Sequence, residues 1–147
     1  MVTRGSYCLC IKVDRDSTIR IGSLGVIKFS KGKYVYVGSA LNSLIPRLSR
    51  HIRTSKGEGK VAHWHIDYLL REPNVELSDI YATDWAVRIE CEIAAKISEQ
   101  GRSIPRFGCS DCDCKSHLFN VKTFEFIKDL GLKRVNLSSF AFSPSPL

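Results

Sequence analysis

Three basic side chains lie at helical spacing in residues 43–53, the segment SLIPRLSRHIR. His51 follows Arg47 by four positions and Arg50 follows it by three, so on a helix Arg47 neighbours both of them. A guanidinium there could hold a phosphate through its fork of donors, and an imidazole could move a proton at neutral pH. The same spacing also fits a solvated basic helix face, and both interpretations stay open at this point.

A carboxylate on a second predicted helix could add a metal ligand. Glu90 stands between Ala86 and Ala94, one turn away on each side, in the segment AVRIECEIAAKISEQG. A hard oxygen ligand of this kind suits a divalent cation. A surface carboxylate beside the buried face would look the same, and Glu92 is an equally charged rival.

Three of the six cysteines fall in one loop, CSDCDCKSH, which could bind zinc. Its possible ligands are Cys109, Cys112, Cys114 and His117. Four ligands in so short a loop would be strained, so a subset completed by Cys91 or His65 is easier geometrically. Free or loop-packing thiols are the alternative, and Ser110 and His117 could instead contact a bound strand.

The segment HWHID, residues 63–67, is also open to two interpretations. Its two histidines share a face if the backbone is extended and diverge if it is helical, while Asp67 could orient an imidazole or cap a turn. Alternatively Trp64, Ile66 and Leu69 are core and the polar residues are surface.

Bulk properties limit the class of protein. The chain has 147 residues, 44% of them hydrophobic and 25% charged, with a formal net charge of +7. This composition is typical of one globular domain, and the charge favours an anionic partner such as nucleic acid. No apolar stretch is long enough for a signal peptide or membrane span, so we expect a cytoplasmic protein with no membrane partner. In that compartment the six cysteines are expected as thiols or metal ligands.

The elements that must position these residues follow from hydrophobic periodicity. Residues 5–13 alternate, with Tyr7, Leu9, Ile11 and Val13 on one face, which predicts a half-buried strand. Strands over 18–29 and 33–39 would complete an antiparallel meander, and Tyr34 and Tyr36 would share a face as ordinary strand residues.

Further elements are expected along the rest of the chain. Helices are predicted after an N-cap at Ser43, over HWHIDYLL, over 86–100 and over TFEFIKDLG, with strands at VELSDIYA and LFNV. Residues 1–137 are predicted to form a single domain, and residues 138–147 a flexible tail.

Several of these segments together resemble known nucleases. GSY at 5–7, YVG at 36–38, RLSRH at 47–51 and IECEIAAKI at 89–97 occur in the order used by the GIY-YIG nuclease superfamily. The longer segments GSYCLCI, GKYVYVGSA, RLSRHIR, WHIDYLL and GCSDCDCKSHLF resemble the archaeal and bacterial DUF123 family. That family is GIY-YIG-related and is sometimes fused to an endonuclease III-like repair enzyme. The resemblance covers most of residues 5–119.

The resemblance implies a fold and a site. The expected fold is α/β (α+β), with a small, mainly antiparallel central sheet flanked by helices. Tyr7 and Tyr36 would position or deprotonate an attacking water, Arg47 would stabilise the charge of the phosphorane, and His51 would assist proton transfer. Glu90 would hold Mg²⁺ or Mn²⁺. The side chains expected to contact nucleic acid are Lys33, Arg50, Arg53, His65, Ser110 and His117.

Two features differ from the usual GIY-YIG pattern. Gly5 and Tyr36 are about thirty residues apart, so an extra hairpin is expected between the first two motifs. Ser6 also stands where the family usually has an apolar residue.

Three functions are compatible with the sequence. The first is a divalent-metal-dependent endonuclease acting on DNA, in repair or recombination. The second is a nucleic-acid-binding module that assists a partner repair enzyme without chemistry of its own. The third is a zinc-stabilised structural domain.

Overall fold

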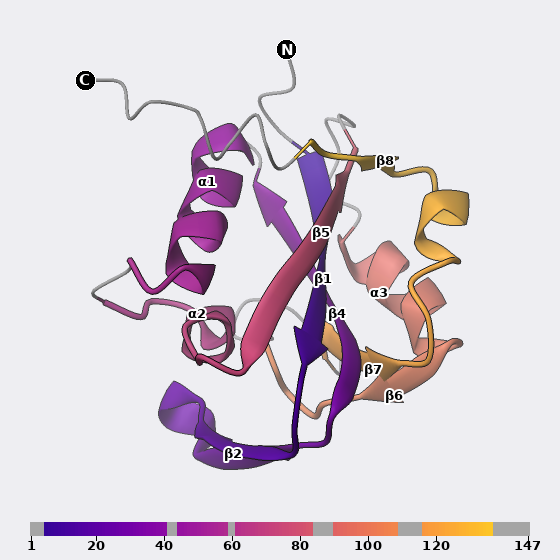
Figure 1. The fold of residues 1–147 in the computed structure, drawn as a ribbon. Coiled ribbons are helices and arrows are strands. Elements are labelled where there is room, and N and C mark those ends of the chain that lie inside the picture. Colours follow the sequence, from indigo (N-terminus) through magenta and orange to yellow (C-terminus); the bar gives the residue numbers. More distant parts are fainter. Residues whose placement is uncertain (1–4, 41–43, 59–60, 84–89, 109–115, 137–147) are drawn as a thin grey trace, which may run out of the picture.

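A six-stranded antiparallel sheet forms the centre of the protein, whose structure is a computed structural model (Figure 1). The structure describes residues 5–40, 44–58, 61–83, 90–108 and 116–136. The sheet order is β6-β7-β4-β1-β5-β8. Its strands are β1 (Gly5–Val13), β4 (Gly32–Ala40), β5 (Val75–Ala82), β6 (Gly101–Ser103), β7 (Leu118–Val121) and β8 (Lys133–Arg134). This arrangement confirms the expected α+β class with a mainly antiparallel sheet.

Strand β1 lies in the middle of the sheet and is buried on both faces. It pairs with β4 on one side and β5 on the other. Alternate residues do point to opposite faces as predicted, but Cys8 and Cys10 are as buried as Tyr7 and Leu9. The prediction of a half-buried strand was therefore wrong, because elements cover both faces of the sheet.

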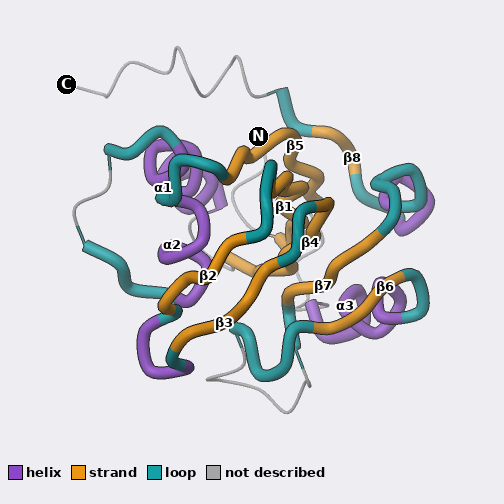
Figure 2. The backbone as a smooth tube through the Cα atoms, turned by 60° about the horizontal axis from the view of Figure 1, so that its bottom comes forward, coloured by secondary structure: helices purple, strands orange, loops and turns teal. Residues whose placement is uncertain are grey.

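The hairpin expected between the first two motifs is present as a separate element. Within the described ranges, strands β2 (Ser17–Arg20) and β3 (Val26–Phe29) pair only with each other, and the short 3-10 helix Gly22–Leu24 connects them. The predicted continuous meander was wrong, because β1 skips this hairpin and pairs directly with β4. Figure 2 shows the hairpin lying beside the main sheet.

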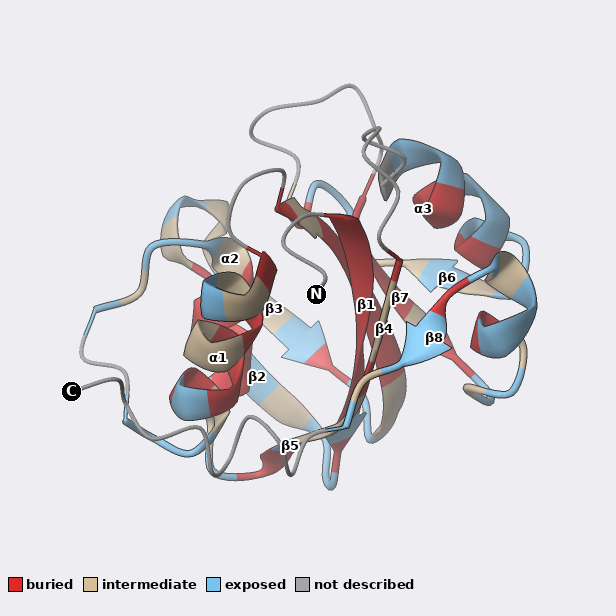
Figure 3. Ribbon diagram, turned by 90° about the horizontal axis from the view of Figure 1, so that it is seen from above, coloured by how far each residue is buried: buried red, intermediate tan, exposed pale blue. Residues whose placement is uncertain are grey.

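Different elements cover the two faces of the sheet (Figure 3). One face, called here the α1 face, carries α1 (Leu44–Ser55), α2 (His65–Leu70) and the hairpin. The opposite α3 face carries α3 (Glu90–Ser98) and the 3-10 helix η2 (Ile127–Leu130). Each face has its own cluster of buried side chains, so β1 contributes to two cores.

The predicted helical stripes explain how the first and third helices pack. Leu44, Leu48 and Ile52 of α1 are buried as expected, and so are Ile93 and Ile97 of α3. Three predicted features lie outside the described residues: the N-cap Ser43, Ile89 of the stripe on the third helix, and the tail 138–147.

The sequence was less informative near the C-terminus. The strand at LFNV is confirmed as β7, but the predicted helix over TFEFIKDLG is reduced to the 3-10 turn η2. Strands β6 and β8 were missed, because three and two residues are too short to show a period. Among the described helices, none is long and apolar enough to cross a membrane.

Candidate active site

The first and second sequence motifs meet because β1 and β4 pair in register. Tyr7 lies opposite Gly38, and Leu9 lies opposite Tyr36. A Cβ atom on Gly38 would lie only 2.5 Å from the Cζ and hydroxyl oxygen atoms of Tyr7. Glycine at position 38 therefore makes room for the Tyr7 ring to lie across β4.

The Tyr7 hydroxyl meets the histidine of α1 inside the protein. Its oxygen is 2.8 Å from Nε2 of His51, and each of the two side chains is only 1% exposed. Three aromatic rings surround the imidazole, with centroid distances of 5.5 Å from Tyr7, 6.4 Å from Tyr36 and 6.1 Å from Trp64. We call His51 and these three aromatic residues the histidine site.

Burial determines the charge state of His51. Desolvation lowers its pKa to about 3, and the positive charges of Arg47 and Arg50 act in the same direction, whereas Asp67 opposes them. The imidazole is therefore neutral at pH 7, and one of its nitrogens can accept the Tyr7 proton.

Two arginines of α1 lie beside the histidine site on the indole of Trp64. The guanidinium carbons of Arg47 and Arg50 are 4.5 Å and 4.9 Å from its ring centroid, within the range of cation–π attraction. Arg47 also donates from Nη1 to the carbonyl oxygen of Ser39, 3.1 Å away. Trp64 is 37% exposed, so this cationic, aromatic surface faces solvent.

Asp67 holds this arrangement together from the first turn of α2. Its Oδ2 accepts hydrogen bonds from Nη2 of Arg50 at 2.8 Å and from the backbone N–H groups of His63 and Trp64 at 2.8 Å and 3.1 Å. Desolvation alone would raise the pKa of this carboxyl, but these hydrogen bonds outweigh it and the pKa is lowered. Asp67 thus stays charged, caps α2 and orients Arg50.

Unsatisfied polar atoms concentrate at this place. Within the described part of the chain, four buried side-chain atoms lack a hydrogen-bond partner, and all belong to residues at or beside the histidine site. They are Ser39 Oγ, Arg50 Nε, His51 Nδ1 and Asp67 Oδ1. Buried polar atoms are normally paired, so such a cluster is typical of a site with a function beyond packing.

The second motif tyrosine joins the site to the loop after β6. The Tyr36 ring is 6.2 Å from Phe107, and a Cβ on Gly108 would come within 3.2 Å of Tyr36. His65 accepts a hydrogen bond from the Gly108 backbone N–H at Nδ1, 2.8 Å away, and desolvation lowers its pKa. His117 is buried, its backbone N–H donates to Phe107, and its carbonyl accepts from Val37.

The remaining predicted residues have different positions. Lys33 points to the α3 face, where its ammonium lies 5.7 Å from the Phe124 ring centroid, and Arg53 is exposed near the end of α1. Glu90 begins α3, but its side chain is not among those described. Four other predicted residues lie outside the described residues: Cys109, Ser110, Cys112 and Cys114.

The described cysteines do not act as predicted in every case. Cys8 and Cys10 are free thiols buried on the α3 face. Cys91 is disulfide-bonded, so the expectation of a thiol or a metal ligand was wrong for this residue. The expectation rested on the compartment, whereas disulfide formation depends on which sulfur atoms the fold brings together.

No metal cluster forms among the side chains that the structure describes. They contain no group of three or more His, Cys, Asp or Glu residues able to hold an ion. Asp67 accepts three hydrogen bonds at Oδ2, so it has a single unpaired oxygen, Oδ1, to offer as a ligand. These residues by themselves do not fit a divalent cation.

Three residues of the site were missed or underestimated from the sequence. Trp64 was considered as core, yet it is partly exposed and carries two arginines. Asp67 was left between two possible interpretations, and Gly38 was seen only as part of a motif. For Trp64 and Asp67 the sequence offered one signal: an aromatic residue followed three positions later by an acid, shortly after a basic helix.

The fold and the site define an α+β protein with a buried tyrosine–histidine pair beside two arginines and an exposed indole. Comparison with protein families gives a more specific classification. The family model "Domain of unknown function DUF123" matches residues 6–137, and the chain belongs to this family. No curated protein and no solved structure matches the chain significantly.

Proposed function

We propose that this protein hydrolyses phosphodiester bonds of nucleic acid, with DNA as the substrate, at the histidine site. The observation that carries the proposal is the Tyr7–His51 contact of 2.8 Å, set beside two arginines and a cluster of unpaired polar atoms. The resemblance to GIY-YIG nucleases and the net charge of +7 support the same proposal.

The proton route begins at the tyrosine. The route uses the tautomer of neutral His51 that carries its proton on Nδ1, in which Nε2 accepts the hydrogen bond of the Tyr7 hydroxyl. As a water attacks phosphorus and the P–O bond to the leaving group breaks, the water gives a proton to the Tyr7 oxygen while Tyr7 passes its proton to His51. The leaving alkoxide takes its proton from solvent. An anionic phosphate nearby would raise the pKa of His51 and favour this transfer.

The arginines supply the electrostatic part of the reaction. Arg47 can bind an equatorial phosphate oxygen as charge develops there, and its stacking on Trp64 restricts its side-chain motion beforehand. Arg50 is held by Asp67 and contributes positive potential at the same surface. Tyr36 completes the aromatic wall beside His51 and would orient the water.

A divalent cation is part of the proposal only through Glu90. The family resemblance assigns Mg²⁺ or Mn²⁺ to this residue, and such an ion would stabilise charge on the phosphate and leaving group. Because the described side chains form no metal cluster, the steps above are assigned to the protein groups alone.

A specific observation also favours a second function, a nucleic-acid-binding module that assists a repair enzyme. Tyr7 and His51 are each only 1% exposed, and the indole of Trp64 lies 6.1 Å from the imidazole. Groups buried to this extent reach a substrate only if the covering side chains move. The partly exposed arginines and indole could bind a strand without that movement, since aromatic and cationic surfaces bind single strands.

A cleavage assay separates the two functions. Plain duplex, single-stranded, flap and branched DNA and one structured RNA are incubated with the full chain in Mg²⁺ or Mn²⁺. We expect DNA cleavage, and we expect Arg47→Ala to lower its rate by about 100-fold or more, as loss of a charge-stabilising donor does. Lys96→Ala, on the α3 face, is the control for removal of a positive charge.

Glu90→Ala tests the metal in the same assay, with Glu92→Ala as the matched control on the same helix. Loss of metal-dependent cleavage in Glu90→Ala alone supports the assignment. Unchanged cleavage in Arg47→Ala would contradict the proposed site. DNA that binds with a steep salt dependence and is never cut would establish the binding module instead.

A further inference from the structure

A cavity lies on the α1 face, outside the histidine site. It has a volume of about 570 Å³ and opens between the β2–β3 hairpin and the part of the sheet formed by β4, β7 and β6. None of its lining residues belongs to the histidine site. Its volume is within the range of small-molecule sites.

Strand register builds the floor of this cavity. Tyr34 lies opposite Asn120, and Asn120 lies opposite Arg102, so the three residues form one row across β4, β7 and β6. The hydroxyl of Tyr34 donates to the carbonyl oxygen of Ser30, 2.8 Å away, and the amide of Asn120 donates to that of Lys33, 2.9 Å away. These bonds fix the two polar side chains in place.

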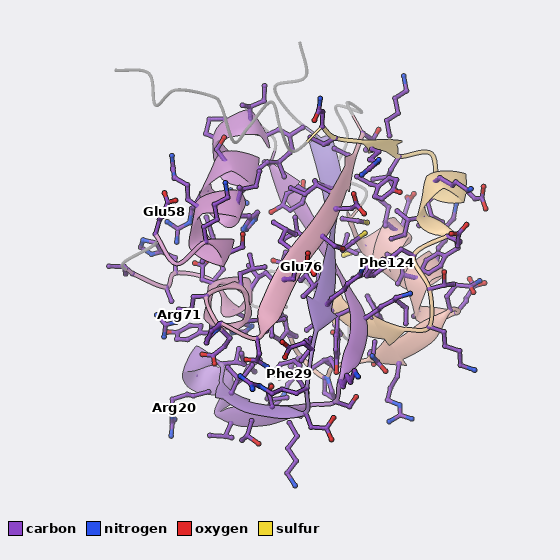
Figure 4. The ribbon with its side chains drawn as sticks, viewed as in Figure 1. Arg20, Phe29, Glu58, Arg71, Glu76 and Phe124 are labelled. Atoms are coloured by element: carbon purple, nitrogen blue, oxygen red, sulfur yellow. The ribbon has the colours of Figure 1, made fainter. Side chains whose placement is uncertain are left out.

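The inserted hairpin and the loop after β6 form the opposite wall. Ile27 and Lys28 line the cavity from β3, and Ile104 and Pro105 line it from the loop. Phe29 lies where the hairpin meets the sheet, whereas Arg20 is at the outer edge (Figure 4). Phe29 packs edge-on against Tyr34 at a centroid distance of 5.8 Å, so the hairpin is anchored at this cavity.

The mouth of the cavity is positively charged. Lys28 and Arg102 are exposed lining residues, and in the part of the chain that the structure describes neither pairs with a carboxylate. Asp16 is the acidic lining residue, and its Oδ1 accepts a hydrogen bond from the Lys31 backbone N–H, 2.7 Å away. An anionic group would therefore be attracted to the two free cations.

We propose that this cavity binds one nucleotide, with its phosphate at Lys28 and Arg102 and its base between the apolar wall and Asn120. Two cations suit a phosphate, apolar side chains suit the face of a base, and an amide can hydrogen-bond to the edge of a base. A phosphate alone would leave the apolar wall unused, and an apolar ligand would leave the cations unpaired. The proposal does not depend on cleavage at the histidine site.

Calorimetric titration of the full chain tests the proposal with three probes: adenosine 5′-monophosphate, adenosine and inorganic phosphate. We expect the nucleotide to bind at least about tenfold more tightly than either part alone, because only it uses both walls. The Lys28→Glu/Arg102→Glu double variant should lose about tenfold or more of that affinity. Both positions are exposed, so the fold should be retained.

The matched control is Lys12→Glu/Lys96→Glu, the same change of charge at exposed positions that do not line the cavity. Equal loss of affinity in both double variants would overturn the proposal, since net charge alone would then explain binding. Affinity for inorganic phosphate equal to that for the nucleotide would also overturn it.

A short single-stranded oligodeoxyadenylate distinguishes the two sources of a nucleotide. If its affinity falls in Lys28→Glu/Arg102→Glu together with that of the mononucleotide, the cavity receives a nucleotide of a bound strand. If only the mononucleotide is affected, the natural ligand is a free nucleotide. Arg47→Ala should lower the cleavage rate by about 100-fold or more without changing mononucleotide binding, so failure of either proposal can be recognised separately.

Discussion

Tyr7 and Cys8 are neighbours in the chain, and both are almost completely buried, yet they face very different surroundings. Tyr7 lies on the α1 face against the imidazole of His51. The side chains of Arg47, Arg50 and Asp67 lie near that imidazole. Cys8 lies on the α3 face among apolar side chains such as Val35 and Ile93. One strand therefore supports a polar site on one side and an ordinary core on the other.

The contrast indicates which face carries function. On the α3 face a thiol is kept protonated by burial, and the pKa of Cys10 is raised to about 12 by desolvation and by the nearby Asp79. On the α1 face the four unpaired buried polar atoms of the described chain gather round one histidine. Burial without polar partners costs free energy, so the α1 face gives up stability that the α3 face keeps.

The largest expected effect is a loss of activity when the Tyr7 hydroxyl on the α1 face is removed, compared with removal of a hydroxyl on the α3 face. Tyr7→Phe removes the group that contacts His51, and we expect a loss of cleavage rate of about 100-fold or more, as for other acid–base groups. Tyr81→Phe, on the α3 face, is the matched control and should cleave like the parent protein. Equal rates for the two variants would contradict the assignment of chemistry to the α1 face.

The next largest expected effect is a loss of stability in acid, which arises from His51 on the α1 face. The pKa of His51 is about 3 in the folded protein and near 6.5 in the unfolded chain, so the unfolded state binds more protons between these values. The free energy of unfolding should therefore fall as pH falls from about 6.5 towards 3, by up to about 1.4 kcal/mol per pH unit. Urea denaturation at a series of pH values measures the slope.

His51→Gln is the control for this slope. It removes the histidine contribution and should leave only the part due to carboxylates such as Asp67, whose lowered pKa acts in the same direction. If the variant loses stability in acid as steeply as the parent, then the imidazole is not held neutral by the fold.

A methyl group at position 38 should have a smaller effect, confined to the α1 face. Gly38→Ala places a Cβ 2.5 Å from Tyr7 ring atoms, and overpacking of this kind costs about 1–3 kcal/mol. In a Tyr7→Leu background the same substitution should cost much less, because the clashing ring is gone. Thermal unfolding of the four proteins gives the coupling, and an absent coupling would mean that Gly38 does not serve Tyr7.

The smallest expected effect tests the α3 face. Cys10 has a raised pKa and Cys8 is fully buried, so neither thiol should react with a neutral-pH alkylating reagent while the protein is folded. Rapid labelling of both positions in the native protein, measured by mass spectrometry of peptides, would show that this face opens and would remove the contrast between the faces.

Local pattern was enough to predict much of the fold. Alternation identified β1 and its two faces, the spacing of Leu44, Leu48 and Ile52 identified α1, and the motif order indicated that Tyr7, Tyr36 and Arg47 belong together. These features depend on the period of a strand or helix and on motifs, both of which can be read without knowing any distant contact.

Other features depend on contacts between distant segments. The hairpin expected from the spacing of the motifs is present, but its separation from the main sheet could not be predicted, because strand pairing is decided by competition among all available edges. The exposure of Trp64 was missed because its environment depends on packing against α1, a helix that is separated from it in the chain by a loop.

The sequence by itself therefore determined the residue types, their faces and the local elements of this protein. The tertiary structure decided that Tyr7 touches His51, that Gly38 leaves room for the contact, and that Asp67 fixes Arg50. It also placed the hairpin opposite Arg102 and so created the cavity between them. The physical reason is that periodicity fixes the direction of a side chain, whereas burial, proton affinity and cavity shape depend on packing between segments far apart in the chain.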